Sequence, residues 1–205
     1  MLKLNEVPTT PGTPLQGGYY VGRFMLKGDL YALIVSPKKE GGFVDVWSNK
    51  PSDGKDGSDA SSYNDGRSNT LAMAVAHSNL AKNILRMNAG GFQDWHLPSR
   101  DELELCYRYL KPSNYTDNMF RAGDNPSSVP PGYPYTEQSP TQTVANEFKE
   151  GGTEAFDTTW HWSSTQGAGD ADYAWLQNFN DGYQDYGHKS SEYSARAVRR
   201  VLIIQ

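Results

Sequence analysis

The fold is decided by residues 90–103, which read Gly90-Gly91-Phe92-Gln93-Asp94-Trp95-His96-Leu97-Pro98-Ser99-Arg100-Asp101-Glu102-Leu103. The two glycines end a preceding helix, because only glycine enters a left-handed C-terminal position without a Cβ clash. Ser99 and Glu102 form an S-x-x-E capping box, in which each side chain satisfies the backbone amide of the other residue. The stretch therefore predicts a brief strand or core plug at residues 95–97, followed by an abrupt helix start.

The helix expected over residues 99–111 has one apolar face. Acidic residues occupy its first turn and basic residues its last, which suits the helix dipole, and Pro112 stops it. Its apolar positions at helical spacing are Leu103, Cys106, Tyr107 and Leu110. Cys106 is the only cysteine of the chain, so it cannot form an internal disulfide, and we expect it to be a buried, inert hydrophobe.

Composition excludes several classes of protein. The chain has 205 residues, a net charge of −5 and no basic run, so nucleic acid is not an expected partner. Aromatic residues reach 12% while hydrophobic residues total 37%, so the core must rely on rings, and Tyr and Trp are also frequent on recognition surfaces. The first residues lack the apolar run of a signal peptide, and no segment has transmembrane length. We therefore expect synthesis in a cytoplasm and no membrane insertion.

The N-terminal part predicts an arm followed by a hairpin. Residues 1–18 are rich in proline and glycine, which disfavours a helix or an inner strand. A frayed terminus and an extended arm laid on another subunit both fit this pattern. Residues 19–37 predict a β-hairpin with strands at 19–26 and 30–35, and residues 43–47 predict a third strand.

A polar segment at residues 48–67 carries three regularly spaced acidic residues, Asp53, Asp56 and Asp59. Their spacing is not that of an EF-hand, which needs oxygens at alternate positions and a terminal bidentate Glu. We expect a solvated loop, and the sequence leaves open whether any calcium binds it.

A second amphipathic helix is expected to begin at Ser68 or Asn69 and to end before Gly90. We interpret His77, at the border of its apolar face, as structural. The apolar face comprises Met73, Ala76, Leu80, Ile84 and Met87.

Residues 112–140 contain six prolines and predict a long loop of the kind that is functional or clasps a neighbour. It ends at Ser139-Pro140-Thr141-Gln142, a second capping-box pattern with proline at the favoured first helical position. We expect a short helix there, ended by a glycine pair, with Val144, Ala145 and Phe148 facing inward.

The C-terminal part predicts β-structure. Strands are expected at residues 160–165, 172–179, 183–188 and 195–204, and Asn180-Asp181-Gly182 predicts a tight turn between the second and third. The arginines of the last strand need carboxylate or backbone partners.

The order of these segments resembles the bacterial and phage family of unknown function typified by the C-terminal domain of the Legionella collagen-like adhesin. The resemblance covers about residues 65–202. It rests on residues 94–103, Trp162-Ser163-Ser164-Thr165, Ala174-Trp175 with Phe179, and Ala197-Val198-Arg199-Arg200-Val201. It implies an α+β, C-type-lectin-like fold, close to formylglycine-generating enzymes and phage tropism determinants. We expect a single domain over residues 19–205, with the hairpin included and the arm at 1–18.

An enzymatic function is disfavoured by the residues. Formylglycine-generating enzymes need an active-site cysteine pair, and this chain has one cysteine. It has no G-x-S-x-G elbow, P-loop or dinucleotide fingerprint, and its four histidines lack metal-ligand spacing. We expect no catalysis, cofactor or metal. A carbohydrate-active or sulfatase-modifying type of enzyme is a remote alternative.

The N-terminal 65 residues look like those that precede this domain in phage virion proteins. The expected function is therefore that of a non-enzymatic virion protein (a tail fibre, appendage or decoration) that binds a host receptor or glycan. The alternative is a purely structural capsid or tail decoration. We expect residues 1–18 to contact virion subunits and the protein to form a homo-oligomer.

The candidate ligand-binding residues lie around the predicted turn, which should be exposed at the end of its hairpin. Trp160, Trp162 and Trp175 are expected in the core, Trp175 because it should share a face with Tyr173 and Phe179. We expect Tyr183 and Tyr186 to stack on a sugar while amides and carboxylates bond its hydroxyls. The full set is Asn178, Asn180, Asp181, Tyr183, Asp185, Tyr186 and His188.

Overall fold

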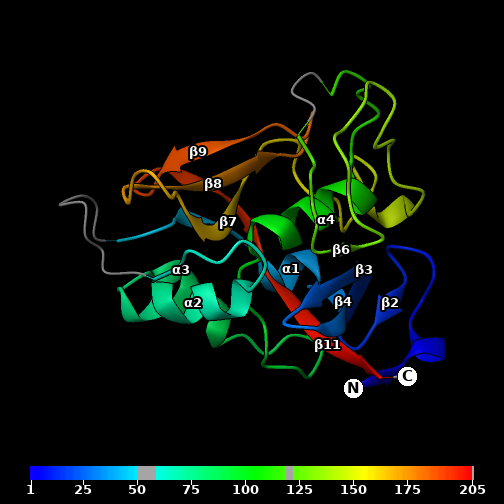
Figure 1. The fold of residues 1–205 in the computed structure, drawn as a ribbon, viewed down its shortest axis with the longest axis horizontal. Helices are drawn as coiled ribbons and strands as arrows, with labels where there is room; N and C mark the ends of the chain where they lie inside the picture. Colours follow the sequence, from blue (N-terminus) through cyan, green and yellow to red (C-terminus); the bar gives the residue numbers. More distant parts are fainter. Residues whose placement is uncertain (50–58, 119–121, 205) are drawn as a thin grey trace.

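The computed structural model describes residues 1–49, 59–118 and 122–204, and it is an α+β structure with two β-sheets (Figure 1). The helices are α1 (Lys38–Gly41), α2 (Gly66–Val75), α3 (Asn79–Leu85) and α4 (Arg100–Leu110), with 3-10 helices η1 (Leu4–Glu6) and η2 (Asn146–Phe148). The strands are β1 (Leu2–Lys3), β2 (Pro14–Leu15), β3 (Gly18–Leu26), β4 (Asp29–Val35), β5 (Gly42–Val46), β6 (Ser128–Val129), β7 (Trp160–Gln166), β8 (Tyr173–Asn178), β9 (Gln184–His188), β10 (Glu192–Arg196) and β11 (Val198–Ile204).

The first sheet has the strand order β1-β11-β4-β3-β2, and β6 also pairs with β3. Strands β3 and β4 form the hairpin predicted for residues 19–37, and both turn residues, Lys27 and Gly28, have positive φ. Strand β11 runs antiparallel to β4, and β1 runs parallel to β11. The two chain termini consequently lie together at this sheet (Figure 1).

The second sheet has the strand order β5-β10-β7-β8-β9. Its β8–β9 hairpin is the one predicted from the turn at residues 180–182. Strand β5 is the predicted third strand, but it pairs with β10 here and does not extend the N-terminal hairpin. Both sheets therefore combine strands from the first and last thirds of the chain.

The stretch at residues 90–103 connects the two sheets. The capping box forms as predicted, since the Ser99 amide donates to Glu102 Oε2 at 2.8 Å and the Glu102 amide donates to Ser99 Oγ at 3.3 Å. His96 forms a backbone bridge to Val198 of β11. Helix α4, which follows, contacts β3 of the first sheet and β7 and β8 of the second (Figure 1).

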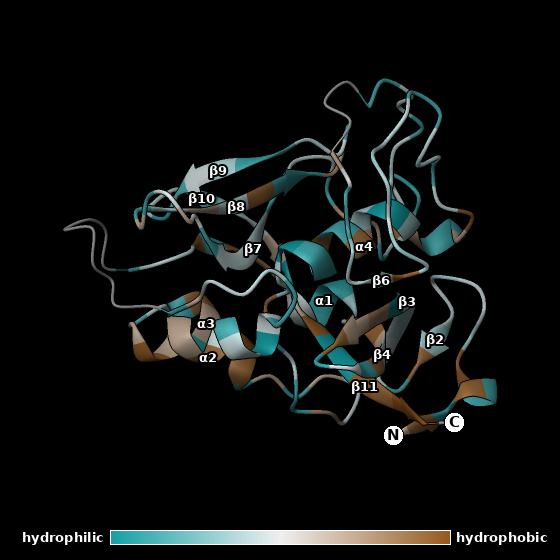
Figure 2. Cartoon of the chain, viewed as in Figure 1, coloured by the Kyte–Doolittle hydropathy of each residue, from teal (hydrophilic) through white to brown (hydrophobic). Residues whose placement is uncertain are grey.

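The core relies on aromatic rings, as the composition predicts. Trp95 and Trp162 are fully buried, whereas Trp160 is half-buried. Cys106 is buried on α4, and this burial raises the pKa of its thiol. Figure 2 shows hydrophobic residues on β11 and β4, while β9 is drawn in teal and near-white shades.

The expected C-terminal strand at residues 195–204 is in fact two strands in two sheets. Ala197 separates them: its amide donates to the Gly41 carbonyl at 2.9 Å, and its carbonyl accepts from the Ser36 amide at 3.0 Å. The backbone thus changes partners between β10 and β11. The arginines of these strands find carboxylates, as expected: Arg196 with Glu154 at 2.8 Å, Arg199 with Asp94 at 2.7 Å and Arg200 with Asp65 at 2.8 Å.

The single helix expected from Ser68 or Asn69 is also two helices, α2 and α3. The break falls at His77, which has φ +73° and is exposed. Ser78 then caps α3, because its Oγ accepts from the Ala81 amide at 3.2 Å while donating to the Trp47 carbonyl at 2.6 Å. A contact with a distant backbone carbonyl therefore overrides the local helical periodicity.

The helix expected after Ser139 is absent from its predicted place. Residues 140–145 are non-helical, and only the short η2 follows. The segment is instead held to the end of α4, since the Thr143 amide donates to the Lys111 carbonyl at 2.9 Å. Val144 is 74% exposed, contrary to expectation, whereas Phe148 is buried as expected.

Residues 1–18, for which a frayed terminus and an extended arm on another subunit were both open, pack on this domain. Strands β1 and β2 pair with β11 and β3, and Leu2 is buried. The Arg199 guanidinium donates to the Gln16 carbonyl at 3.1 Å. Backbone hydrogen bonds to β11 and β3 thus order this segment, although its prolines lack amide donors. The expected contact of this segment with other subunits remains a prediction.

The long loop after α4 folds back on its own domain. Asn125 donates to Glu104 Oε2 at 2.7 Å, and the Tyr135 hydroxyl donates to Glu104 Oε1 at 2.7 Å. Of the three acidic residues considered for calcium, Asp53 and Asp56 lie outside the described residues. No helix among those described combines the length and apolar character needed to cross a membrane.

Candidate binding surface on the β8–β9 hairpin

The β8–β9 hairpin has one inner and one outer face. In β8, Ala174 and Leu176 are buried, while Tyr173 is exposed and Trp175 is half-buried. Trp175 pairs across the ladder with Tyr186 of β9. Since side chains alternate between the faces of a strand, the outer face carries the large rings. The expectation that Trp175 lies in the core is therefore wrong.

The outer rings form a contiguous cluster. The Trp175 and Tyr186 ring centres are 4.2 Å apart, and Tyr63 meets Trp175 edge-on at 6.1 Å. Tyr63 is 39% exposed and Tyr186 is 44% exposed. Burial and the neighbouring Tyr63 raise the pKa of the Tyr186 phenol, so the Tyr186 hydroxyl stays protonated at neutral pH. We call Tyr63, Arg100, Trp175 and Tyr186 the outer ring cluster.

Arg100 is held between the rings of this cluster. Its guanidinium carbon lies 4.8 Å from the Trp175 ring centre and 5.3 Å from the Tyr63 ring centre. Its Nη2 donates to Gln184 Oε1 at 3.0 Å. Arg100 is the first residue of α4, so the capping box that begins this helix also positions the cation.

A cavity of about 520 Å³ adjoins the cluster. It lies where the loop after β7 approaches the outer face, and Gly167 anchors that loop by donating its amide to the Tyr173 carbonyl at 2.8 Å. The cavity is lined by Gly167, Gly169, Asp170, Tyr173, Asp185 and Tyr186. Two of the sequence-predicted residues, Asp185 and Tyr186, therefore meet here.

The predicted turn is not an exposed tip. Gly182 is buried, and a Cβ added to it would lie 2.5 Å from the Tyr107 ring and 2.7 Å from the Tyr135 ring. The Asn180 carbonyl accepts from Ser113 Oγ at 3.0 Å. The end of α4 and the loop that follows it cover the turn, which hairpin geometry alone does not reveal.

The polar side chains of the turn accept hydrogen bonds from backbone amides of the same turn. Asn178 Oδ1 accepts from the Asn180 amide at 2.8 Å, and Asp181 Oδ1 accepts from the Tyr183 amide at 3.0 Å. This is the usual role of Asn and Asp in turns. These side chains shape the turn, and one acceptor oxygen of each is already used.

Tyr183 and Tyr186 lie on opposite faces of the hairpin. Tyr183 packs against Trp160 at 5.8 Å, on the side of the core strand β7, whereas Tyr186 packs against Trp175 on the outer face. Side chains three positions apart in an extended chain point to opposite faces, so one ligand cannot stack on both rings. His188 lies on the outer side, 5.4 Å from Tyr173.

Sequence reasoning missed the other members of the outer ring cluster. The outer position of Trp175 could have been predicted from the sequence, because side chains alternate along a strand and Trp175 lies between Ala174 and Leu176, which face the core. Arg100 and Tyr63 come from a helix start and a loop that only the tertiary fold brings to this face.

Other titratable groups occupy structural positions. Burial raises the pKa of Asp101 to about 6 despite the hydrogen bond from Ser127 Oγ at 2.7 Å. His96 is fully buried, and its Nε2 lies 3.2 Å from Glu102 Oε1 of the capping box. Within residues 1–49, 59–118 and 122–204, no three His, Cys, Asp or Glu side chains gather closely enough to hold a metal ion.

Comparison with known families identifies the domain. Residues 45–199 match the family described as the Lcl C-terminal domain, which is about three quarters of this chain. The chain therefore belongs to that family. No curated protein sequence matches it.

Proposed function

We propose that this Lcl C-terminal domain is a non-catalytic attachment module that binds a carbohydrate-bearing receptor through the outer ring cluster. One observation carries the proposal: half-exposed rings flank a fixed guanidinium on an outer sheet face, beside a cavity. Trp, Tyr and Arg are the residues that dominate binding energy at recognition surfaces. A hydrophobic core has no need of them there.

The chemistry of the cluster suits a sugar. A sugar ring presents an apolar face of C–H groups, which can stack on an aromatic ring, and a rim of hydroxyls. Nε of Arg100 and Nε1 of Trp175 have no acceptor in the described part of the chain. A ligand hydroxyl that reaches either donor after a small side-chain rotation would supply the missing hydrogen bond, and an unmade one costs about 1–3 kcal/mol.

The wider setting is part of the same proposal. We infer a C-type-lectin-like arrangement and a homo-oligomeric virion protein of a phage, such as a tail fibre, appendage or decoration, made in the host cytoplasm. The support is the resemblance of the element order and of the N-terminal 65 residues. Among the seven residues predicted from the sequence, Tyr186 and His188 lie on the outer face, and Asp185 lines the adjoining cavity. Asn178, Asn180, Asp181 and Tyr183 are assigned to the turn and the inner side.

The test is attachment of the full chain to a glycan array and to host cells. A Tyr63→Ala, Tyr186→Ala double variant should fold normally, since both residues are exposed on the outer face and neither belongs to the core. It should lose roughly 1–3 kcal/mol of binding per ring, by analogy with other stacking contacts.

A matched control is available in two exposed tyrosines outside the cluster, Tyr115 and Tyr133, which are 42% and 69% exposed. The Tyr115→Ala, Tyr133→Ala variant should attach like the parent. If the cluster variant also attaches like the parent, the proposal is wrong, and a purely structural decoration role becomes the better explanation.

A further inference from the structure

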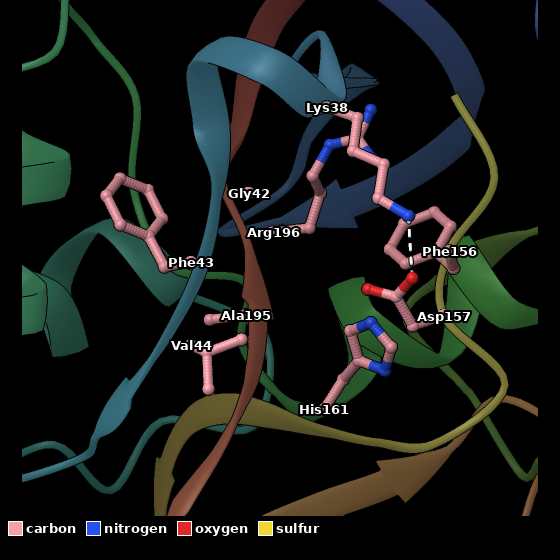
Figure 3. Close-up of a pocket in the computed structure, with 9 residues that line it drawn as sticks. All are labelled: Lys38, Gly42, Phe43, Val44, Phe156, Asp157, His161, Ala195 and Arg196. Atoms are coloured by element: carbon pink, nitrogen blue, oxygen red, sulfur yellow. Dashed lines mark hydrogen bonds and ion pairs between the residues drawn. The ribbon is translucent and has the colours of Figure 1, made fainter. Parts of the chain in front are cut away.

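A second cavity, of about 230 Å³, lies beside β5 and β10 and below α1. Figure 3 shows four polar side chains converging there: Lys38, Asp157, His161 and Arg196. The Phe156 ring lies next to them, while the Phe43 side chain points away on the other side of β5 (Figure 3). This cavity shares no lining residue with the outer ring cluster.

One wall of this cavity is fixed. Arg196 is 3% exposed, and its Nε donates to the Ser36 carbonyl at 2.8 Å while its Nη2 donates to Glu154 Oε2 at 2.8 Å. Glu154 Oε2 also accepts from the Lys38 amide at 2.7 Å. The charge of Arg196 is therefore neutralised by a carboxylate of the same wall.

His161 supplies an acceptor from a largely buried ring. It is 2% exposed, and its ring packs edge-on against Phe156 at 5.4 Å. Its Nδ1 lies 3.1 Å from the Thr159 carbonyl, which can only accept, so Nδ1 carries the proton. Nε2 then has a lone pair and no hydrogen-bond partner among the described residues. Burial lowers the pKa of this imidazole to about 4, so it is neutral at physiological pH.

The mouth of the cavity carries an ion pair. Lys38 Nζ donates to Asp157 Oδ1 at 2.7 Å, and both side chains are partly exposed. One carboxylate oxygen of Asp157 and the remaining Lys38 protons are left for a ligand. The two cations of the cavity, Lys38 and Arg196, are each paired with a carboxylate, so the site selects neither an anion nor a cation by charge.

The geometry points to a small, uncharged, polyhydroxylated ligand in this cavity, either a polyol or a single sugar ring. A hydroxyl both donates and accepts, so it can pair with His161 Nε2, with Asp157 and with Lys38. The Phe156 ring offers an apolar surface to the carbon skeleton. Pockets for drug-sized ligands measure about 300–1,000 Å³, so this smaller cavity fits one ring. The inference is independent of the proposed function.

The test is a titration of the isotope-labelled full chain with glycerol, glucose, galactose and N-acetylglucosamine, followed by NMR. At least one probe should bind with Kd of about 1–10 mM and shift the ring nitrogens of His161 and the amides of Gly42 and Val44. Absence of saturable shifts there with all four probes would overturn the inference.

Two variants locate the site. His161→Phe keeps the ring and removes the acceptor, and it should weaken binding about tenfold, the value of one hydrogen bond. Asp157→Ala changes the partly exposed mouth, so it should fold even if the first variant does not, and it should have a similar effect. Unchanged affinity in Asp157→Ala and in any folded His161→Phe would contradict the site.

Tyr186→Ala separates this inference from the attachment proposal. The variant should bind the small probes like the parent, because Tyr186 does not line this cavity. If Tyr186→Ala abolishes probe binding while Asp157→Ala leaves it unchanged, the probes bind the outer ring cluster and the inference is wrong.

Discussion

The two faces of the β8–β9 hairpin differ in what covers them. On the inner face, Leu176 is 4% exposed and packs with Trp162 in the core between the sheet and the helices. On the outer face, Trp175 packs against Tyr63, Arg100 and Tyr186, and Tyr186 stays 44% exposed. The residues alternate along one backbone, yet only one set is needed to fold the domain.

This difference shows why composition alone misplaces a site. The hairpin is rich in Tyr, Asn and Asp, and all of these residues look suitable for binding. The alternation of side chains along the strand places Tyr186 on the outer face and Tyr183 on the inner side. The turn before Tyr183 is covered by Tyr107 and Tyr135. A surface is thus defined by what remains uncovered once the other elements have packed.

The largest expected effect is on the inner face. Leu176→Ala should lower the free energy of unfolding by about 2–5 kcal/mol, because it leaves a cavity in a well-packed core. Urea denaturation of the parent and the variant measures the difference. The outer-face substitution Tyr186→Ala is the control and should cost less than about 1 kcal/mol. Equal losses would mean that the two faces do not differ as described.

The second effect concerns pH and another buried residue of this sheet, His161. Its folded pKa of about 4 lies below the unfolded value of 6.5, so the unfolded chain binds more protons between these values. The contribution of His161 is therefore fully present above pH 6.5 and is lost as pH falls toward 4, by up to about 3 kcal/mol.

Asp101 opposes this trend, because its folded pKa of about 6 is raised above the ordinary value of 3.8. Its contribution to stability is present at low pH and is lost as pH rises through 6. Thermal unfolding of the parent and of His161→Phe across pH 4–7 isolates the histidine. The stability difference between the two proteins should change with pH, and a constant difference would contradict the assignment.

The third effect separates the two tyrosines. Tyr186→Ala should weaken receptor attachment by roughly 1–3 kcal/mol with little change in stability. Tyr183→Ala should do the reverse: attachment stays at the parental level, while stability falls by about 1 kcal/mol because the ring contact with Trp160 is lost. Attachment assays and denaturation of both variants measure this. Loss of attachment in both would show that the faces act together.

The smallest effect concerns the helix start that presents Arg100 to the outer face. Ser99→Ala should cost about 1 kcal/mol, because the Glu102 amide loses its capping oxygen. Ser139→Ala is the matched control, since its capping-box pattern starts no helix here, and it should leave the midpoint of unfolding unchanged. A shift of similar size in both variants would show that the cap at Ser99 has no special role.

Short-range patterns were enough to predict much of this fold. The capping box at Ser99, the buried Cys106, both hairpins and the pairing of the C-terminal arginines with carboxylates follow from neighbouring residues and from charge. The cap, the cysteine and the hairpins depend on hydrogen bonds or apolar spacing within a few residues, whereas the arginines pair with carboxylates that are distant in the chain. The α+β class and the family followed from their order along the chain.

Contacts between distant segments decided the rest. Trp47 ended the helix at His77 through its carbonyl, Ala197 divided the last strand between two sheets, and Lys111 held the segment after Ser139 out of a helix. The outer ring cluster is also of this kind, because Tyr63, Arg100 and Trp175 come from a loop, a helix start and a strand. The amino-acid sequence by itself determined where helix α4 and the two hairpins form and which residues can pack. The tertiary structure decided which rings stay uncovered, because burial depends on neighbours that are far away in the chain.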